Sequence, residues 1–363
     1  AIESALSTVG LTESTLEKEI RELAKKIDAI EQQIRELERL IAAVRKQVIE
    51  EAAVIGATLS MTYMSTDLQA QQYDALFIDE ISMAPLLPMF FAMGLVSSSC
   101  TLIGDFLQLP PIGTQSKNEL LKKWHNRSFF DIIGMNSVGK ARSSEFVKPL
   151  SIQYRMNPAI AAIPNKLFYG DILQSGDNTK TRVLSDQWVQ DQPLFLVDTS
   201  EGAPWMNRGP NGQSRCNLYH ATLAAAMAQD YLANETQDGK EITVGVVVPY
   251  RSQKDLINDI LDESLGKNSP ARKRIEVNTV HSFQGGEKDV IICDSVESEG
   301  KDAKWFFFDD GSRNNHSAPL MLNVAVTRAK SKFILLANVK FVQQNFTGHI
   351  FKDMLDILHQ HGV

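Results

Sequence analysis

The chain has 363 residues, of which 43% are hydrophobic and 22% charged, and its formal net charge is −7. These values are typical of a globular protein with about two domains. They exclude a globally basic surface, so any nucleic-acid site must be a local groove. The three cysteines are not spaced as metal ligands, and we expect reduced thiols in a cytoplasmic protein. No apolar run reaches the length of a membrane span.

Residues 12–50 contain no Gly or Pro and predict one long helix. Apolar residues recur along it at alternating spacings of four and three, which is the heptad repeat of a left-handed coiled coil. They are Leu16, Ile20, Leu23, Ile27, Ile30, Ile34, Leu37, Ile41, Val44 and Val48. Such a seam needs a partner helix, and no comparable repeat follows in the chain. We expect the partner to be either a second copy or a segment outside this sequence.

From residue 52 onward, apolar runs alternate with helical patterns, which predicts a parallel α/β architecture. We expect three domains: a coiled-coil helix at 1–51, a first α/β block at 52–147 and a second at 148–363. In the first block the predicted strands are 54–59, 75–79 and 101–104, with a helix at 85–96 and an irregular stretch at 117–144. In the second block the predicted strands are 194–197, 243–248, 275–280, 290–294 and 332–337, and the predicted helices are 218–233, 253–261 and 350–359.

The apolar run from Ala75 to Ile78 ends in two adjacent carboxylates, Asp79 and Glu80. A buried parallel strand would deliver these acids to a ligand crevice at its carboxyl end. Asp79 would hold Mg²⁺ through its water shell, and Glu80 would orient a water molecule against a phosphate. The alternative is a strand that ends in a solvated turn. Gln108, in the string Gly-Asp-Phe-Leu-Gln-Leu-Pro-Pro, is placed to bind a terminal phosphate or its attacking water.

The second block carries three further polar strings. Tyr154 and Arg155 combine a ring that can stack on a base with a bidentate phosphate fork, although a surface Arg beside a core Tyr would look the same. A later string places Thr, His and Ser at the end of a predicted strand, followed by two glycines suited to phosphate and an acid suited to a ribose hydroxyl. Arg328, in Asn-Val-Ala-Val-Thr-Arg-Ala, has the setting of an arginine finger.

In this order the strings resemble the later motifs of superfamily 1 helicases, in the branch that contains the nonsense-mediated-decay RNA helicase and its DNA-acting relatives. The resemblance covers roughly residues 52–340. It implies two RecA-like lobes, the first one incomplete, behind a coiled-coil stalk helix, and it implies ATP and Mg²⁺ as cofactors. Single-stranded DNA or RNA is the implied partner.

The resemblance also implies a role for each matching residue. It implies that Asp79 binds Mg²⁺. Catalytic or phosphate-contacting residues would be Asp79, Glu80, Gln108, Arg155 and Arg328. Tyr154 would stack on adenine, and Gly285 and Glu287 would contact the phosphate and the ribose. Contacts to the single strand fall on Thr58, Thr279 and His281.

The family begins with a phosphate-cradling (Walker A) loop, G-x-x-x-x-G-K-[ST], that this sequence lacks. The nearest match runs from Gly134 to Ala141, but Ala141 has no hydroxyl for Mg²⁺ and the string follows the Gln108 motif instead of opening the fold. We therefore expect this stretch to be a connecting loop. We also expect the chain to be the C-terminal piece of a helicase that hydrolyses ATP slowly or not at all by itself.

Two other readings of the sequence remain open at this point. One is a non-catalytic nucleic-acid-binding scaffold, which the intact set of acids and arginines disfavours. The other is an assembly protein in which the heptad helix dimerises and the α/β part serves only as a platform.

Overall fold

The computed structural model describes residues 13–361 except 114–116, 185–190, 203, 210–211, 213, 234–238, 284, 301–316 and 347. The chain divides into two compact units, one made of Ala1–Ile78 and Leu87–Thr101 and the other of Asp79–Leu86 and Leu102–Val363. This division does not follow the boundary predicted near residue 147, which stays a prediction. The sequence also predicts that Phe306 and Phe308 are core residues, and both lie outside the described residues.

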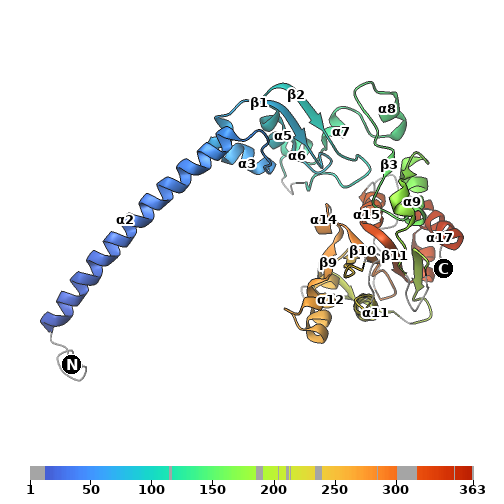
Figure 1. Ribbon diagram of the computed structural model, residues 1–363. Helices are drawn as coiled ribbons and strands as arrows, with labels where there is room; N and C mark the ends of the chain where they lie inside the picture. Colours follow the sequence, from blue (N-terminus) through green and yellow to red (C-terminus); the bar gives the residue numbers. More distant parts are fainter. Residues whose placement is uncertain are drawn as a thin grey trace. The chain divides into compact units, whose positions relative to one another are not determined.

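The first unit is dominated by one long helix, α2 (Figure 1). Its residues are helix formers, and exposed pairs one turn apart, such as Arg21 with Glu17 at 3.2 Å, add about 0.3–0.5 kcal/mol each. Strands β1 and β2 pair into a two-stranded sheet. The elements of this unit are α2 (Glu13–Glu51), α3 (Leu59–Met64), α4 (Thr66–Gln69), β1 (Tyr73–Ile78), α5 (Leu86–Met93) and β2 (Val96–Leu102). The predicted long helix is thus confirmed, with its ends shifted by one residue.

Two strand predictions in this region are wrong. Residues 54–59 form no strand, because Thr58 instead caps α3 by accepting a hydrogen bond from the Met61 amide. The third strand lies at Val96–Leu102, not at 101–104. Its Ser-Ser-Ser-Cys run is mostly exposed and lacks the apolar signal of a buried strand, so pairing with β1 determines it.

The second unit is built on a five-stranded parallel sheet in the order β5-β11-β10-β8-β9. The register joins Val248 of β8 to Thr279 of β9, and Cys293 of β10 to Leu335 of β11. All five predicted strands of the second block are therefore confirmed, within one to three residues at their ends. Their bounds are β5 (Leu194–Asp198), β8 (Val244–Val248), β9 (Ile275–Thr279), β10 (Lys288–Asp294) and β11 (Ala329–Ala337).

Helices cover both faces of this sheet, so the unit has three layers. Side chains alternate along each strand: Val246 and Val248 pack with α11 and α12 on one face, whereas Val247 packs on the other face with α9, α15 and α17. Because both faces are buried, the inner strand β8 is apolar throughout. These helices are α9 (Pro158–Pro164), α11 (Leu218–Tyr231), α12 (Arg251–Leu265), α15 (Ser317–Val326) and α17 (His349–His361).

Short elements connect these layers. The stretch predicted to be irregular at 117–144 contains three short helices, and each has a side-chain N-cap, provided by Asn118, Ser128 and Ser137. That prediction overlooked the caps. The short elements are α6 (Glu119–His125), α7 (Phe129–Ile132), α8 (Val138–Ser143), β3 (Ile152–Gln153), η1 (Asn165–Tyr169), β4 (Gln174–Ser175), α10 (Asp177–Lys180), β6 (Met206–Arg208), β7 (Arg215–Asn217), α13 (Pro270–Lys273), α14 (Val280–Phe283) and α16 (Val339–Asn345). Among the described helices, none combines the length and apolar character needed to cross a membrane.

Candidate nucleotide-binding site

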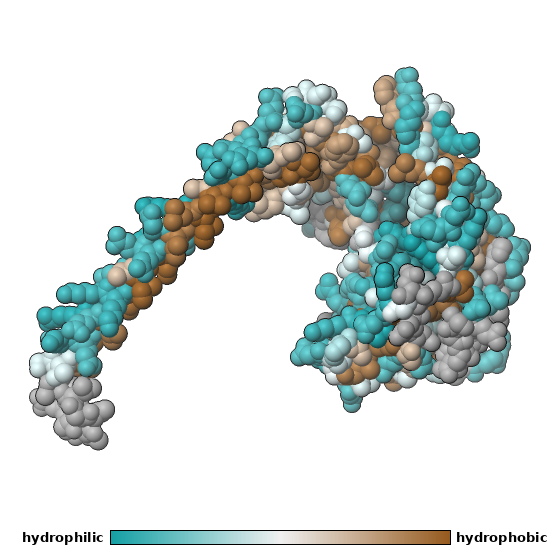
Figure 2. Space-filling view, in the orientation of Figure 1, coloured by the Kyte–Doolittle hydropathy of each residue, from teal (hydrophilic) through white to brown (hydrophobic). Residues whose placement is uncertain are grey.

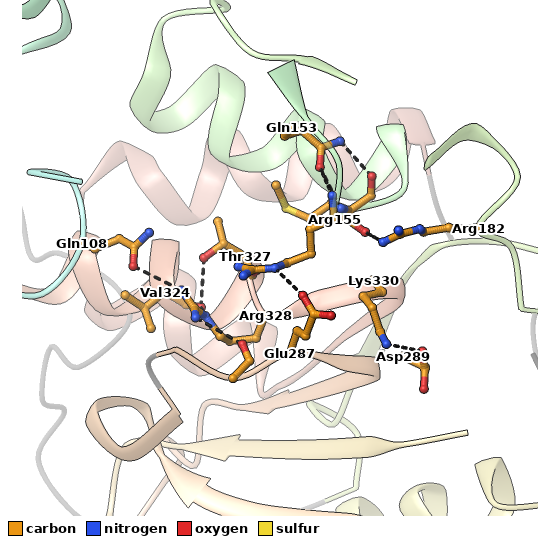
Figure 3. A network of polar contacts seen from close by, with 12 residues as sticks. Gln108, Gln153, Arg155, Arg182, Glu287, Asp289, Val324, Thr327, Arg328 and Lys330 are labelled. Atoms are coloured by element: carbon orange, nitrogen blue, oxygen red, sulfur yellow. Dashed lines mark hydrogen bonds and ion pairs between the residues drawn. The ribbon is translucent and has the colours of Figure 1, made fainter. Parts of the chain in front are cut away.

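Arg328 lies at the centre of a polar network on the amino-terminal edge of the sheet, just before β11 (Figure 3). Its side chain is buried, with a relative exposure of 1%. The guanidinium donates to the carbonyl oxygens of Val324 and Gly286 and to Oε1 of Gln108, each at 3.2 Å. These bonds fix the direction of the guanidinium.

Gln108 is held by the loop that the sequence places after β2. Asp105 accepts hydrogen bonds from the Leu107 amide at 2.9 Å and from Nε2 of Gln108 at 3.1 Å. At Gly104 a Cβ atom would lie 2.7 Å from the side chain of Ile81, so the loop needs glycine there. The loop thus presents the side-chain oxygen Oε1 of Gln108 to Arg328.

Arg155 approaches the same region from the turn after β3. Its Nε donates to Glu287 at 2.9 Å, and its Nη1 donates to the Thr327 carbonyl at 3.1 Å. The Gln153 side chain accepts hydrogen bonds from the backbone amides of Arg155 and Met156, at 2.9 and 2.8 Å, which fixes the turn. The ion pair between Arg155 and Glu287 is half-exposed, so groups of a bound ligand can replace either residue as the partner of the other.

A cavity of about 430 Å³ lies among these groups. Tyr154 is 59% exposed, and its ring rests on Gly176, where a Cβ atom would lie 2.4 Å from the ring. The cavity therefore combines an accessible aromatic face with cationic and amide groups, as a nucleotide requires. Its lining residues are Gln108, Gln153, Tyr154, Arg155, Met156, Tyr169, Arg182, Glu287 and Thr327.

Opposing effects determine the pKa of Arg328. Burial, and then the nearby charge of Arg155, lower its pKa to about 10, while the charges of Glu80, Tyr169 and Asp105 raise it. The guanidinium stays protonated at neutral pH. Glu80 is thus close enough for its charge to raise the pKa of the buried arginine.

Asp79 and Glu80 form a tight turn after β1. The Glu80 amide donates to Asp79 Oδ1 at 2.8 Å, and Glu80 has a φ of 54°, which is uncommon for a non-glycine residue. Such strained residues cost about 1–3 kcal/mol and cluster at functional sites. Asp79 is exposed, and its Oδ2 has no hydrogen-bond partner among the described residues. A carboxylate of this kind fits a Mg²⁺ ion that keeps most of its own water.

Of the other predicted residues, Glu287 pairs with Arg155, and Gly285 precedes Gly286, whose carbonyl oxygen accepts from Arg328. Gly285 has a φ of +87° and open space at its Cβ position. Thr279 ends β9 at the carboxyl edge of the sheet, where its Oγ1 lies 3.4 Å from Ser282 Oγ, and the exposed His281 follows in α14. Thr58 belongs to the first unit and caps α3.

The sequence reasoning did not assign Tyr169, which joins the Gln108 loop to α15. Its hydroxyl donates to Asp105 Oδ2, and Asn323 Nδ2 donates to that hydroxyl at 2.9 Å and to the Leu107 carbonyl at 2.7 Å. Burial, followed by the charge and hydrogen bond of Asp105, raises the Tyr169 pKa well above its usual value. The π-helix η1 ends at Tyr169 and is capped by Gly170, which has a φ of 59°. In the sequence, the pair Tyr169-Gly170 was the signal that could have pointed to this residue. π-Helical turns are frequent at functional sites.

Asp289 anchors the start of β10 beside this site and gives a testable pH dependence. It pairs with Lys330 Nζ at 2.8 Å, and it accepts hydrogen bonds from the Thr243 amide at 2.9 Å and from its hydroxyl at 2.6 Å. Burial raises the Asp289 pKa, but these partners lower it by more, so the net shift is downward. Because the folded pKa is depressed, the stabilisation is present above the usual aspartate value and is lost as the pH falls through the folded pKa.

We therefore expect Asp289→Asn to lower the free energy of unfolding by about 1–3 kcal/mol near neutral pH. The deficit should shrink as the pH falls, since wild-type Asp289 then becomes protonated as well. Urea unfolding across this pH range measures the effect, with the exposed Asp259→Asn as the control. A deficit that is constant with pH would contradict the assignment.

Two family models, each described as an AAA domain, match residues 3–116 and 126–340. Among curated relatives, helicase sen1 of Schizosaccharomyces pombe is 30% identical over 84% of this chain and 17% of its own length. ATP-dependent helicase upf1 of the same species is 27% identical over 77% of this chain and 28% of its own length. A solved structure titled the structure of PRRSV helicase is 14% identical with a TM-score of 0.34, covering 74% of this chain and 36% of that chain.

The AAA-domain matches and the parallel sheet define a nucleotide-hydrolase type of domain. The chain belongs to the superfamily 1 helicases and is related to the upf1-like enzymes of nonsense-mediated decay. This confirms the predicted family and the mixed α/β class with a long N-terminal helix. The chain spans less than a third of the length of the sen1 and upf1 relatives that it matches.

Proposed function

We propose that this chain provides motor elements of an ATP-dependent helicase or translocase that acts on single-stranded DNA or RNA. The observation that carries the proposal is the network in which Gln108, from one motif, hydrogen-bonds Arg328 at 3.2 Å, beside the cavity that Arg155 lines. Gln108 and Arg155 line the cavity, and the buried Arg328 lies behind Gln108, so an amide and a guanidinium with a second guanidinium behind them are suited to the terminal phosphate of ATP.

Each residue then has a chemical task. Glu80 orients the attacking water, and Asp79 would hold Mg²⁺, which would supply positive charge to offset that of the phosphates. Arg155 and Arg328 neutralise the charge that develops on the transferred phosphoryl group. The exposed ring of Tyr154 stacks on adenine. When nucleotide binds, Glu287 leaves its ion pair with Arg155 and accepts from a ribose hydroxyl, while Gly285 allows close approach of phosphate.

Thr58, Thr279 and His281 are proposed to contact the single strand or to transmit its binding. Thr279 and His281 are suited to this task because they stand at the carboxyl edge of the sheet, whereas Arg328 and Glu287 stand at the amino edge. Separate edges would let nucleic acid and nucleotide bind the same lobe together. Relatives carry names that refer to DNA replication and to nonsense transcripts, so both nucleic acids are test substrates. A cytoplasmic location, expected from reduced cysteines, stays a prediction.

The polypeptide of residues 1–363 is expected to hydrolyse ATP at or near the background rate. Without backbone amides and a lysine around the β-phosphate, Glu80 and the arginines have no substrate held in line. The test compares it with a loop-completed chain, in which a superfamily 1 segment carrying G-x-x-x-x-G-K-[ST] precedes residue 1. Phosphate release with and without single-stranded DNA or RNA is the measurement.

We expect the loop-completed chain to be stimulated by single strands and residues 1–363 alone to stay inactive. Stimulated turnover by residues 1–363 that disappears in Glu80→Gln would contradict the expected inactivity. A loop-completed chain that folds and binds nucleotide but never hydrolyses it would contradict the proposed function.

A further inference from the structure

The hairpin formed by β6 and β7 lies over the carboxyl edge of the five-stranded sheet. The Met206 amide donates to the Glu299 carbonyl at 2.8 Å, and Asn217 Nδ2 donates to the Val296 carbonyl at 3.3 Å. Both carbonyls belong to the segment that follows β10. The hairpin therefore stands on the same edge of the sheet as Thr279, which ends β9.

A buried ion pair fixes this hairpin to the rest of the second unit. Arg215 of β7 lies 3.3 Å from Glu297, and the two side chains are only 10% and 3% exposed. The Tyr250 hydroxyl also donates to Glu297, and the Arg215 guanidinium lies 5.8 Å from the centre of the Tyr250 ring. Because a buried charge is costly to separate from its partner, these contacts make the hairpin a rigid support.

Three exposed apolar side chains gather at the open end of the hairpin. Trp205, Leu218 and Tyr219 are 60%, 61% and 41% exposed, whereas the visible surface of the second unit is largely hydrophilic (Figure 2). The register pairs Met206 with Asn217, so Trp205 and Leu218 adjoin that pair. Exposed apolar residues that cluster on a polar surface indicate a binding site, which singly scattered ones do not.

The backbone supports both aromatic rings from one side. Gly300 has a φ of +102°, and a Cβ atom there would lie 2.7 Å from Cε2 and Nε1 of Trp205, so glycine lets the ring lie directly on the chain. Tyr219 rests on Gly202 in the same way, since a Cβ atom there would lie 2.4 Å from the tyrosine hydroxyl. A ring that is already held loses little freedom when a nucleobase stacks on its open side.

Two cations near the hairpin favour a negatively charged ligand. Arg208 ends β6 and Arg251 begins α12, and both are exposed without an ion pair to any described residue. Gly209 lets the two segments approach, because a Cβ atom there would lie 2.0 Å from Ser252 Oγ. Glu299 is bridged to the tryptophan through the backbone, but its carboxylate accepts hydrogen bonds from two neighbouring side chains at 2.7 and 2.8 Å. The hairpin thus combines open rings with available positive charge, as a site for a single strand does.

We propose that the β6–β7 hairpin is a base-stacking platform for single-stranded nucleic acid, in which Trp205 stacks on a base and Arg208 and Arg251 contact neighbouring phosphates. This inference rests on the proposed function, and it extends the strand site along the edge that carries Thr279 and His281. Stacking needs neither a 2′-hydroxyl nor a particular base, so the platform accepts both DNA and RNA.

Fluorescence anisotropy of labelled single strands with the 363-residue chain tests the proposal. We expect Trp205→Ala to raise the Kd for oligothymidylate and for oligouridylate by about fivefold or more. Trp205→Phe keeps an aromatic face and should recover most of that loss. Trp124→Ala removes an exposed tryptophan of α6, outside the hairpin, and should leave both Kd values unchanged. Circular dichroism checks that each variant folds.

An abasic strand of the same length separates stacking from a structural role of Trp205. At low salt its phosphates still bind, so Trp205→Ala should bind it as tightly as wild type does, whereas Arg208→Ala should weaken binding of both kinds of strand and lower its salt dependence. If wild type binds strands but Trp205→Ala leaves the oligothymidylate Kd unchanged, or weakens both kinds of strand equally, the platform is overturned and the proposed function stands. A wild-type chain that binds no strand would contradict both.

Discussion

Replacing Arg328 with alanine is expected to lower nucleic-acid-stimulated ATP hydrolysis by about three orders of magnitude or more in the loop-completed chain. Arg328 is the most central cation of the candidate site, and it is buried and oriented by Gln108, Gly286 and Val324. Because burial excludes water, the guanidinium would act on developing phosphate charge in a medium of low dielectric constant. Steady-state phosphate release measures the loss.

The matched control is Arg142→Ala, since Arg142 is exposed on α8 and does not belong to the candidate site. It should retain the wild-type rate. The Arg328 variant must also be shown to fold, because it leaves Gln108 and two backbone carbonyls without their donor, which costs about 1–3 kcal/mol for each buried group. A folded Arg328→Ala protein within about tenfold of the wild-type rate would contradict the proposed role.

Glu80→Gln is expected to lower kcat by about 10²–10⁴-fold while leaving KM for ATP nearly unchanged. The amide has the size of the carboxylate but cannot accept the proton of the attacking water. The charge of Glu80 raises the pKa of Arg328, so the variant should also lower that pKa. Single-turnover kinetics separates the chemical step from binding.

Glu145→Gln, an exposed substitution of the same chemistry, is the control and should be silent. If Glu80→Gln raised KM and left kcat unchanged, the residue would be a binding group and not the base that orients water.

The sequence allowed the second sheet and α2 to be predicted because their signals are local. Val244–Val248 is apolar on every residue, as a strand covered on both faces must be. The seam of α2 repeats without interruption from Leu16 to Val48. The strand at Val96–Leu102 could not be predicted in this way, because its serines carry no apolar pattern and its position depends on pairing with β1.

The candidate site could be predicted only as a set of residues and not as a network. Arg155 and Glu287 are 132 positions apart, and Gln108 and Arg328 are 220 apart, so no local pattern joins them. Tyr169 illustrates the same limit. Its hydroxyl links Asp105 to Asn323, and these partners lie in two other motifs. Motifs identified the chemistry, whereas the fold determines which groups touch.

The central claim is that Arg155 and Arg328 form one receptor for the terminal phosphate of ATP. Calorimetric titration of the loop-completed chain with Mg²⁺ and either ADP or a non-hydrolysable ATP analogue tests it most directly. We expect wild type to prefer the analogue by about tenfold or more, equivalent to about 1.4 kcal/mol, and Arg155→Ala/Arg328→Ala to bind both nucleotides equally. A folded double variant that keeps the full preference would contradict the account.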